Sequence, residues 1–378
     1  MILLIITISF LILYLYLIIY CYYGWNSIPR FERDDKKICK TFISIIIPAR
    51  NESANIYNCI QSIIEQNYPR DLFEIIIVDD HSNDDTARIV LEIKEPNISL
   101  IKLSDELNNQ IINSYKKKAI EIGISKAHGE LIVTTDADCI FNKYWLRTIA
   151  EFYEKENPFF IAAPVSFYDE NSLIKIFQSL DFITMQGITG AAVYKKFLSM
   201  CNGANLAYEK KVFYEVGGFK GIDDIASGDD MLLMYKIFKL YPQKISFLKN
   251  KSAIVQTKAA EGLKEFLNQR IRWASKADKF QDKKITFVLL IVYLFNCFLC
   301  VTTIYTFISH QYIYYCLGIW SLKIAVELAF ANQLSIFFDK QQLLWWFIPL
   351  QPFHTVYILI SGWLGKFGSY SWKERQVK

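Results

Sequence analysis

Hydrophobic residues are distributed unevenly along this chain of 378 residues. Residues 1–23 carry no charged side chain and consist mainly of Ile, Leu and Tyr. Such a segment can span a hydrocarbon core of roughly 30 Å, and it lacks the basic start and small-residue cleavage site of a secretory signal. Three further apolar segments lie at about 285–309, 311–332 and 343–364. We therefore expect a retained N-terminal membrane anchor and two or three C-terminal membrane segments.

Between these segments, short apolar runs alternate with stretches of helical pattern. The apolar runs predict strands at 42–47, 73–78, 98–103, 131–134, 159–164 and 205–208. The intervening stretches predict helices at 53–66, 84–94, 115–127, 173–186 and 231–240. Asn51 or Ser53 is expected to cap the first of these helices. Nearly continuous apolar strands separated by helices are typical of a parallel sheet covered on both faces, so the predicted fold class is α/β with a mostly parallel sheet.

Residues 264–279 form an amphipathic pattern that follows the main α/β stretch. Its apolar stripe recurs at helical spacing and consists of Leu263, Phe266, Leu267, Ile271 and Ala274. Arg270, Lys276 and Lys279 lie off that stripe. This arrangement predicts a helix that rests on a membrane surface.

The hydrophobic pattern divides the chain into six parts. They are an anchor at 1–23, a basic linker at 24–40, a main domain at 41–262, an interfacial helix at 263–282, membrane segments at 283–366 and a basic tail at 367–378. Within the middle C-terminal segment, Lys323 and Glu327 are four residues apart, so we expect them to pair and to face a protein interior.

Basic residues predict the side of the membrane on which the main domain lies. Five of them directly follow the first apolar segment: Arg30, Arg33, Lys36, Lys37 and Lys40. By the positive-inside bias, the main domain is expected to be cytoplasmic, at a bacterial-type plasma membrane. The C-terminal tail is also basic, and three full crossings would place it outside. We therefore expect one C-terminal segment not to cross, and the segment with Pro349 and Pro352 is typical of a kinked or re-entrant helix.

Net charge and cysteine usage narrow the function classes. The formal net charge is +4, and the basic residues cluster beside membrane segments. This pattern favours an anionic membrane surface over a nucleic acid as partner. Cys297 and Cys300 form a CxxC inside a hydrophobic segment, which we interpret as apolar helix residues and not as a zinc site. The sequence contains no GxGxxG, P-loop, HExxH or GxSxG motif.

Three pairs of carboxylates lie at predicted strand ends or helix starts: Asp79 with Asp80, Asp136 with Asp138, and Asp229 with Asp230. Ligand-binding loops of an open parallel sheet lie at the carboxyl ends of its strands. The first pair can accept hydrogen bonds from a nucleoside, and the second can hold a divalent cation that bridges a diphosphate. The third can supply a base. Each pair also has a simpler interpretation, as an acidic turn or a helix cap.

Gln269, Arg272 and Trp273 occupy neighbouring positions on one face of the predicted interfacial helix. Arg can bind a departing diphosphate with two hydrogen bonds, and Trp can stack on a sugar. The alternative is a helix whose Trp and Arg only anchor it among lipid headgroups.

The order of these motifs resembles the membrane-bound family 2 glycosyltransferases. These are inverting GT-A enzymes that include cellulose, hyaluronan and poly-N-acetylglucosamine synthases and ceramide glucosyltransferase. The resemblance covers about residues 41–280. It opens with SIIIPARNE at 44–52 and continues through VDDHS at 78–82, TDAD at 135–138, GDD at 228–230 and QRIRW at 269–273.

The resemblance implies a role for each of these residues. The residues implied to contact the donor nucleotide are Pro48, Ala49, Asn51, Glu52, Asp79, Asp80, Lys116 and Asp136. Asp136 and Asp138 would hold Mg²⁺ or Mn²⁺, and Asp230 would be the catalytic base. The residues implied to contact the diphosphate or the acceptor are Asn205, Asp229, Gln269, Arg272 and Trp273.

This sequence departs from the family pattern in two places. Tyr115 precedes Lys116 where the family often has Gly, and Asp229 stands where it usually has Glu. The first departure leaves the role of Lys116 in phosphate binding open.

The resemblance implies transfer of a sugar from a nucleotide-diphosphate sugar, expected to be UDP-linked, to a lipid or lipid-linked glycan. The alternative is a processive polysaccharide synthase, for which three or four membrane segments are few without an oligomer or accessory subunit. A non-catalytic membrane scaffold with a degenerate transferase fold is a further alternative.

Overall fold

A computed structural model describes residues 2–34, 36–107, 112–225, 228–275, 282–368, 370–372 and 375–377. The chain divides into two compact units. The sheet unit comprises 28–166 and 192–258, and the helical unit comprises 1–27, 167–191 and 259–378. Within the predicted main domain at 41–262, residues 167–191 and 259–262 group with the helical unit, and the predicted domain boundaries stay a prediction.

The sheet unit is built on a seven-stranded sheet with the order β3-β2-β1-β4-β8-β6-β9. The strands are β1 (Ile43–Ala49), β2 (Phe73–Asp79), β3 (Ile98–Lys102), β4 (Leu131–Thr134), β6 (Phe160–Ala162), β8 (Leu206–Glu209) and β9 (Ile245–Phe247). β1 is parallel to β2 and β4, β2 to β3, and β6 to β9, while β8 is antiparallel to β4 and β6. The predicted α/β class and mostly parallel sheet are confirmed, and each predicted strand agrees with an observed one within three residues at either end.

Helices of the sheet unit join these strands. They are α2 (Ile56–Ile64), α3 (Thr86–Glu92), α4 (Leu103–Leu107), α5 (Tyr115–Lys126), α6 (Trp145–Glu156), α8 (Lys210–Glu215) and α9 (Asp229–Leu240). Short strands β5 (Ile140–Phe141) and β10 (Val255–Lys258) pair antiparallel, and β7 (Val165–Tyr168) leads into the helical unit. Single 3-10 turns lie at Arg70–Leu72, Pro242–Lys244 and Lys251–Ala253.

The core of the sheet unit lies around β1, in which Ile43, Ile45, Ile46 and Ile47 are fully buried. Burial on both faces of the strand explains its continuous apolar run. α5 approaches β1 closely at Gly123, where a Cβ atom would lie 2.6 Å from Cγ2 of Ile46. This contact holds α5, and with it the residues at the start of α5, against the centre of the sheet.

The first helix of the sheet unit begins later than predicted. α2 starts at Ile56 with Asn55 as its N-cap, so neither Asn51 nor Ser53 is the cap. Asn51 adopts a left-handed backbone conformation with φ of 51°, which interrupts a helix. The predicted cap was wrong because these polar side chains and amides bond to the next loop instead.

The helical unit contains six helices in its described part. They are α1 (Ile2–Ser27), α7 (Leu173–Tyr194, of which the last three residues belong to the sheet unit), α10 (Leu263–Ala274), α11 (Lys283–Ile308), α12 (Ile313–Phe338) and α13 (Phe347–Phe367). Single-turn or short 3-10 segments lie at His310–Tyr312 and Gln341–Trp346, and β11 (Tyr370–Trp372) pairs with β12 (Arg375–Val377). The predicted helix at 264–279 is observed to Ala274, whereas Lys276 and Lys279 lie outside the described residues.

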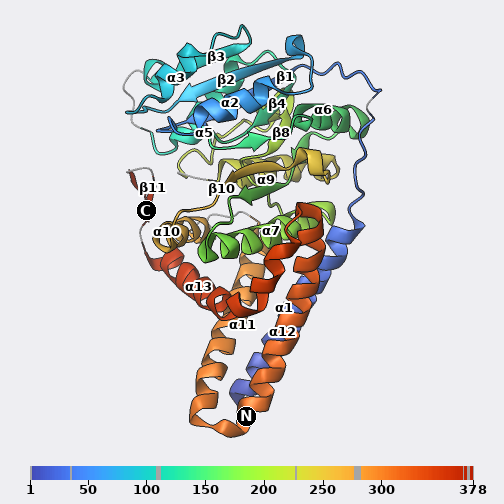
Figure 1. Ribbon diagram of the computed structural model, residues 1–378, viewed down its shortest axis with the longest axis vertical. Coiled ribbons are helices and arrows are strands. Elements are labelled where there is room, and N and C mark those ends of the chain that lie inside the picture. Colours follow the sequence, from blue (N-terminus) through green and yellow to red (C-terminus); the bar gives the residue numbers. More distant parts are fainter. Residues whose placement is uncertain are drawn as a thin grey trace. The chain divides into compact units, whose positions relative to one another are not determined.

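Four segments of the helical unit are long and apolar enough to cross a membrane: Ile2–Ser27, Lys283–Ile308, His310–Phe338 and Gln341–Phe367. In Figure 1, α1, α11 and α12 run side by side, and they contact one another. α13 takes a different direction in the same view, packs mainly against α10 and α11, and carries Pro352 inside it. Whether this last segment crosses the membrane stays a prediction.

A buried polar network joins helices of this unit. Lys323 is fully buried and its Nζ lies 2.8 Å from Oε1 of Glu327, which confirms the predicted pair and its interior position. The Tyr14 hydroxyl on α1 donates to Glu327 at 2.5 Å, and Lys323 also donates to Gln351 on α13. Charges inside apolar helices are costly unless they are paired in this way.

Candidate active site

The carboxyl ends of β1 and β2 form one wall of the candidate site. Their parallel register places Ala49 opposite Asp79, and the Asp80 amide donates to the Ala49 carbonyl at 2.7 Å. Asp79 is buried, and its Oδ1 has no hydrogen-bond partner among the described residues. An unsatisfied buried carboxylate oxygen is costly, so Asp79 has a free acceptor for a ligand N–H or O–H. Pro48 and Ala49 contribute the neighbouring backbone.

Asp80, by contrast, is held by its neighbours. Its Oδ1 lies 2.9 Å from Nδ1 of His81, and Arg50 donates to the carbonyls of Asp80 and His81 at 2.9 and 3.3 Å. The His81 and Tyr115 rings are perpendicular to each other, with centroids 5.5 Å apart. Of the two neighbouring carboxylates, Asp79 is the one with an acceptor atom to spare.

The loops after β1 and β2 are fastened together by hydrogen bonds. The Asn51 amide donates to Ser82 at 3.0 Å, and the Asn51 side-chain carbonyl accepts from the amide of Asn83 at 2.8 Å. The Glu52 amide donates to Thr86 at 2.8 Å, and the Glu52 carboxylate accepts from Asn55. Asn51 therefore has a role in shaping the loop in addition to any contact with a nucleotide.

Asp84 completes this connection between the two loops. It accepts hydrogen bonds from the amides of Ser53 and Thr86, both at 3.0 Å, and from the Thr86 hydroxyl. Although burial raises the pKa of Asp84, the bonds from Thr86 and Ser53 outweigh it and lower the pKa to about 2. Asp84 lies in none of the sequence motifs described above.

Lys116 lies at the centre of the site, in the first turn of α5. Its Nζ is 2.7 Å from Oδ1 of Asp136, beyond β4, and 3.4 Å from Oδ2 of Asp229, on α9. Burial lowers the pKa of Lys116, but the charges of Asp136 and Asp229 outweigh burial and raise the pKa above its ordinary value. Lys116 therefore remains a cation, and it brings two of the predicted carboxylate pairs together.

Asp138 lies deeper than Asp136. Its Oδ2 accepts from the Thr257 hydroxyl on β10 at 3.1 Å, and Thr257 lies in none of the sequence motifs described above. Burial, followed by the charges of Asp136 and Glu52, raises the pKa of Asp138 to about 6. Crowded carboxylates of this kind fit a cation, because a divalent ion relieves their mutual repulsion.

The donor set suits a metal that shares its coordination with a substrate. The described residues contain no group of three or more His, Cys, Asp or Glu that could hold an ion by themselves. Mg²⁺ is commonly bound by one or two carboxylates together with substrate phosphates. Asp136 and Asp138 meet that requirement, and they are the residues that would hold the predicted Mg²⁺ or Mn²⁺.

Asp229 and Asp230 are the first two residues of α9. Gly228 is the N-cap, with φ of 81°, and no side chain caps this helix, so the two carboxylates lie in the first turn and neither is the cap itself. The helix N-terminus favours negative charge there. Oδ2 of Asp230 accepts from the Gly203 amide at 3.1 Å.

Gly203 allows the segment at 202–205 to approach these charges. A Cβ atom on Gly203 would lie 3.4 Å from Oδ2 of Asp229, 3.5 Å from Nζ of Lys116 and 3.6 Å from Oδ2 of Asp230. Gly203, Lys116, Asp229 and Asp230 therefore surround one small space. The structure brings them together from three distant parts of the chain.

Lys117, the neighbour of Lys116, fixes the segment that precedes α9. Lys117 is 2% exposed, and its Nζ donates to the carbonyls of Ile222 and Ile225 at 2.6 and 2.5 Å. Lys236 on α9 donates to the Gly218 carbonyl at 2.6 Å. Lys117 lies within an ordinary helical pattern. Nothing in the sequence therefore indicates that it holds the segment before α9.

Asn205 does not have the position expected of a ligand contact. Its side chain is fully buried, accepts from Nε1 of Trp145 at 3.1 Å and donates to the carbonyls of Pro164 and Ala253, both at 2.8 Å. Because both amide hydrogens are used within the protein, Asn205 holds the 202–205 segment, and its contact with diphosphate or acceptor stays a prediction.

The remaining predicted residues belong to the helical unit, on α10. Gln269, Arg272 and Trp273 are partly buried, and Oε1 of Gln269 has no hydrogen-bond partner among the described residues. The expectation for Arg270 was wrong. It was assigned to the polar side of a surface helix, but it is only 4% exposed and its Nη2 lies 2.8 Å from Oδ2 of Asp181.

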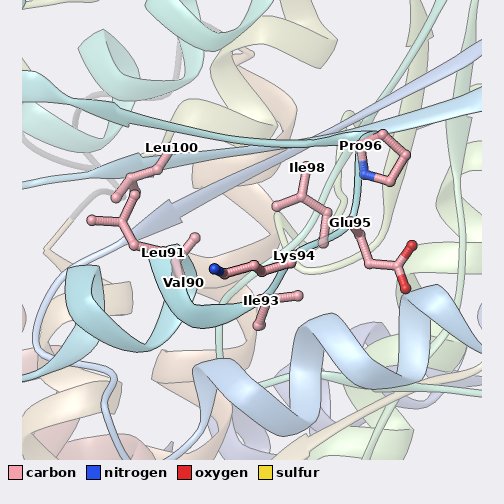
Figure 2. Close-up of a pocket in the computed structure, with 8 residues that line it drawn as sticks. All are labelled: Val90, Leu91, Ile93, Lys94, Glu95, Pro96, Ile98 and Leu100. Carbon is pink, nitrogen blue, oxygen red and sulfur yellow. The ribbon is translucent and has the colours of Figure 1, made fainter.

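The sheet unit also has a surface depression. None of the predicted site residues lines it. It is lined by residues of α3, β3 and the turn that joins them (Figure 2), namely Val90, Leu91, Ile93, Lys94, Glu95, Pro96, Ile98 and Leu100. β3 is the edge strand of the sheet. None of the predicted chemistry falls in this depression.

Comparison with known proteins gives matches along most of the chain. Residues 44–217 match the model of glycosyl transferase family 2, and residues 131–360 match that of glycosyl transferase family group 2. The chain is 26% identical over 254 residues to a probable glycosyltransferase, YdaM, of Bacillus subtilis, covering 66% of this chain and 58% of that protein. It is 24% identical over 240 residues to a poly-beta-1,6-N-acetyl-D-glucosamine synthase of Staphylococcus epidermidis, covering 61% of this chain and 53% of that protein. The chain thus spans less than two thirds of the length of either relative.

The fold also has a counterpart among solved structures. The mannosyltransferase PcManGT of Pyrobaculum calidifontis, in complex with GDP-Man and Mn²⁺, has a TM-score of 0.60 with 16% identity, over 96% of this chain and 98% of that chain. This likeness shows the GT-A fold. Since the second family model matches more than half of the chain, the protein belongs to the family 2 glycosyltransferases.

Proposed function

We propose that the protein is a membrane-bound inverting glycosyltransferase that moves a sugar from a UDP-sugar to a lipid or lipid-linked glycan. The observation that carries the proposal is the convergence of Lys116, Asp229, Asp230 and Gly203 on one space beside Asp136. A base, a cation and a diphosphate-binding carboxylate pair are what a direct displacement at a sugar carbon requires.

The nucleoside is assigned to the ends of β1 and β2. The free Oδ1 of Asp79 is the acceptor for an N–H of the base or an O–H of the ribose, and the Pro48 and Ala49 backbone lies next to it. Asp80 and Asn51 support this wall, because their side chains bond to neighbouring loop residues. Glu52 lies in the same loop and adds charge near Asp138.

The diphosphate is assigned to the space beside Lys116. Lys116 is a cation whose Nζ can bond to a phosphate oxygen once the donor is bound. Asp136 and Asp138 would hold Mg²⁺ or Mn²⁺, which would neutralise negative charge on the leaving UDP. The Tyr115 that replaces a family glycine does not keep Lys116 away from the site, so the proposal retains Lys116 as a phosphate contact.

Asp230 is proposed as the base. Its carboxylate takes the proton of an acceptor hydroxyl, and that oxygen attacks the anomeric carbon from the face opposite the diphosphate. The bond between the anomeric carbon and the UDP oxygen breaks in the same step, so the configuration inverts and no covalent enzyme intermediate forms. Asp229 holds Lys116 beside the reaction space, and Gln269, Arg272 and Trp273 are assigned to the diphosphate and acceptor.

The proposed location is a bacterial-type plasma membrane, with the sheet unit in the cytoplasm. The four candidate spanning helices and the basic residues after the first of them support it. A lipid acceptor suits this number of helices, since a polymer pore needs a closed bundle. The similarity to a poly-beta-1,6-N-acetyl-D-glucosamine synthase supports the second candidate, a processive synthase that would need an oligomer or accessory subunit.

The test uses membranes enriched in the full chain, incubated with a panel of radiolabelled UDP-sugars and then extracted with organic solvent. Membranes that carry the Asp230→Asn variant are the background. We expect label from one donor to enter the organic phase only with the unmodified chain. Label in insoluble polymer would support the synthase instead. Equal incorporation by the variant would contradict the assignment of the base, and no transfer from any UDP-sugar of the panel would contradict the proposed function.

A further inference from the structure

Arg270 lies inside the QRIRW segment, but it has so far no role in the proposed reaction. It is 4% exposed, and its guanidinium lies between an acidic residue of α7 and an aromatic residue of its own helix. Nη2 is 2.8 Å from Oδ2 of Asp181, and the guanidinium carbon is 4.3 Å from the ring centroid of Trp273. A planar guanidinium suits both contacts at once, since it pairs with carboxylates and stacks on aromatic faces.

Asp181 is itself held from another helix. The Tyr357 hydroxyl on α13 donates to its Oδ1 at 2.6 Å, and Nε2 of His354 lies 3.7 Å from the same oxygen. Both Asp181 and Arg270 have side chains that are 5% exposed or less. These contacts hold the Asp181 carboxylate in one orientation. The Asp181 carboxylate in turn orients the guanidinium of Arg270.

Trp273 is the last residue in the series of contacts that runs through Asp181 and Arg270. Its ring lies under Arg270 on one side and within 6.3 Å of the Phe182 ring, one residue after Asp181. α7 thus contacts the Trp273 ring through Phe182 and contacts Arg270, which lies over that ring, through Asp181.

The beginning of α10 is fastened to the same helix. The Gln178 side chain on α7 donates to the Ala260 carbonyl and accepts from the Ala260 amide, both at 2.9 Å. Lys175, one turn earlier, lies 2.9 Å from the Glu261 carboxylate. These bonds hold the residues directly before α10 against α7, and the Asp181 contact holds Arg270 within α10 against the same helix.

A buried ion pair of this kind contributes little net stability, because desolvation offsets the attraction between the charges. What it supplies is a defined geometry. The neighbour of the pair is Trp273, three residues along the same helix, and the resemblance assigns Trp273 to the acceptor and diphosphate.

We propose that Asp181 and Arg270 are positioning residues, which set the orientation of Trp273 for sugar transfer. The inference rests on the proposed function, because it needs Trp273 to act on the acceptor or diphosphate. Neither residue touches substrate in this account. Asp181 orients Arg270, and Arg270 orients the ring.

The test is a double-mutant cycle between Arg270→Lys and Trp273→Leu in the full chain, reconstituted in lipid nanodiscs. Arg270→Lys keeps the charge but loses the planar group that stacks on the ring. We expect each single variant to lower kcat by about 10- to 100-fold, as a misplaced contact can. The double variant should be no slower than Trp273→Leu alone, because Arg270 acts through Trp273. Lys264→Gln, at an exposed position of the same helix, is the matched control and should keep its activity.

Independent effects that multiply in the double variant would overturn the inference, as would a Trp273→Leu or Arg270→Lys variant as active as the unmodified chain. The proposed function is tested separately by donor turnover of the unmodified chain and its loss in Asp230→Asn. If those results hold while the kcat effects of the two single variants multiply in the double variant, only the inference about positioning fails. If Arg270→Lys does not fold, the combined variant Asp181→Asn with Arg270→Met replaces it, because this variant leaves no unpaired buried charge. Adding Trp273→Leu to it should then give a protein no slower than Trp273→Leu alone.

Discussion

Nζ of Lys116 lies 2.7 Å from Oδ1 of Asp136, although the two residues are 20 positions apart in the chain. The contact connects the start of α5 with the loop after β4, and Asp229 extends it to α9 at 3.4 Å. One cation thereby organises carboxylates from two motifs. In the proposed reaction the same cation faces the leaving diphosphate.

Lys116→Met should lower kcat/KM for donor turnover by about 100-fold, the size expected when a preorganised charge contact is lost. The substitution removes the charge while it retains most of the side-chain volume. Steady-state UDP release measures it. Lys118→Met, which removes an exposed lysine of the same helix, is the control and should release UDP at the unmodified rate. An active Lys116→Met would refute a role for Lys116 at the diphosphate.

Gly203→Ala should fold normally but lower kcat by about 10-fold. The new methyl would lie 3.4 to 3.6 Å from charged atoms of Asp229, Lys116 and Asp230, an ordinary packing distance that excludes water or substrate from the space they share. The measurement combines a melting curve with UDP release. Gly318→Ala adds a methyl where no atom lies within 4 Å, and it should change neither. Full activity of Gly203→Ala would mean that the substrate does not enter this space.

Lys117→Met should loosen the segment before α9. The substitution leaves the Ile222 and Ile225 carbonyls without their donor, at a cost of about 1–3 kcal/mol for each group that stays buried. Faster amide hydrogen exchange in peptides that cover 217–225 reports the change. Lys236→Met removes bonds nearer the surface and should have a smaller effect, whereas equal exchange in both variants would contradict the role given to Lys117.

The stability of the β1 and β2 loops should depend on pH through Asp84. Its pKa is about 2 in the folded protein and 3.8 for a free side chain. A carboxyl whose pKa is lowered by folding stabilises the protein above its unfolded pKa, and that contribution is lost as the pH falls from about 4 to 2. Asp84→Asn should therefore melt below the unmodified protein at pH 7, and the difference should disappear near pH 2. A difference that is independent of pH would contradict this origin.

The sequence was sufficient to predict the location of site residues that directly follow a strand. Asp79 and Asp136 lie at the ends of buried strands, and the carboxyl ends of β1, β2 and β4 meet at one edge of the sheet. The carboxylates were therefore expected to lie near one another. Lys116 was expected only from the family resemblance, and its contact with Asp229 depends on how α5 and α9 pack, which no local pattern encodes.

The residues that escaped prediction hold others in place. Thr257 and Lys117 bond to partners more than 100 residues away, and neither stands in a distinctive local pattern. Arg270 was misplaced for a different reason. A helical stripe predicts one buried face, but α10 packs against both α7 and α13 in the helical unit, so a residue off the stripe is buried as well.

The most direct measurement of the central claim is UDP release by Asp230→Asn and by Asp224→Asn in purified membranes with the donor that the unmodified chain uses. Both substitutions replace an aspartate by its neutral isostere, but Asp224 is exposed and precedes α9, whereas Asp230 accepts from Gly203 at the reaction space. If Asp230 is the base, acceptor-dependent release falls by at least about 100-fold in Asp230→Asn and is unchanged in Asp224→Asn. Equal release from Asp230→Asn and the unmodified chain would contradict the account.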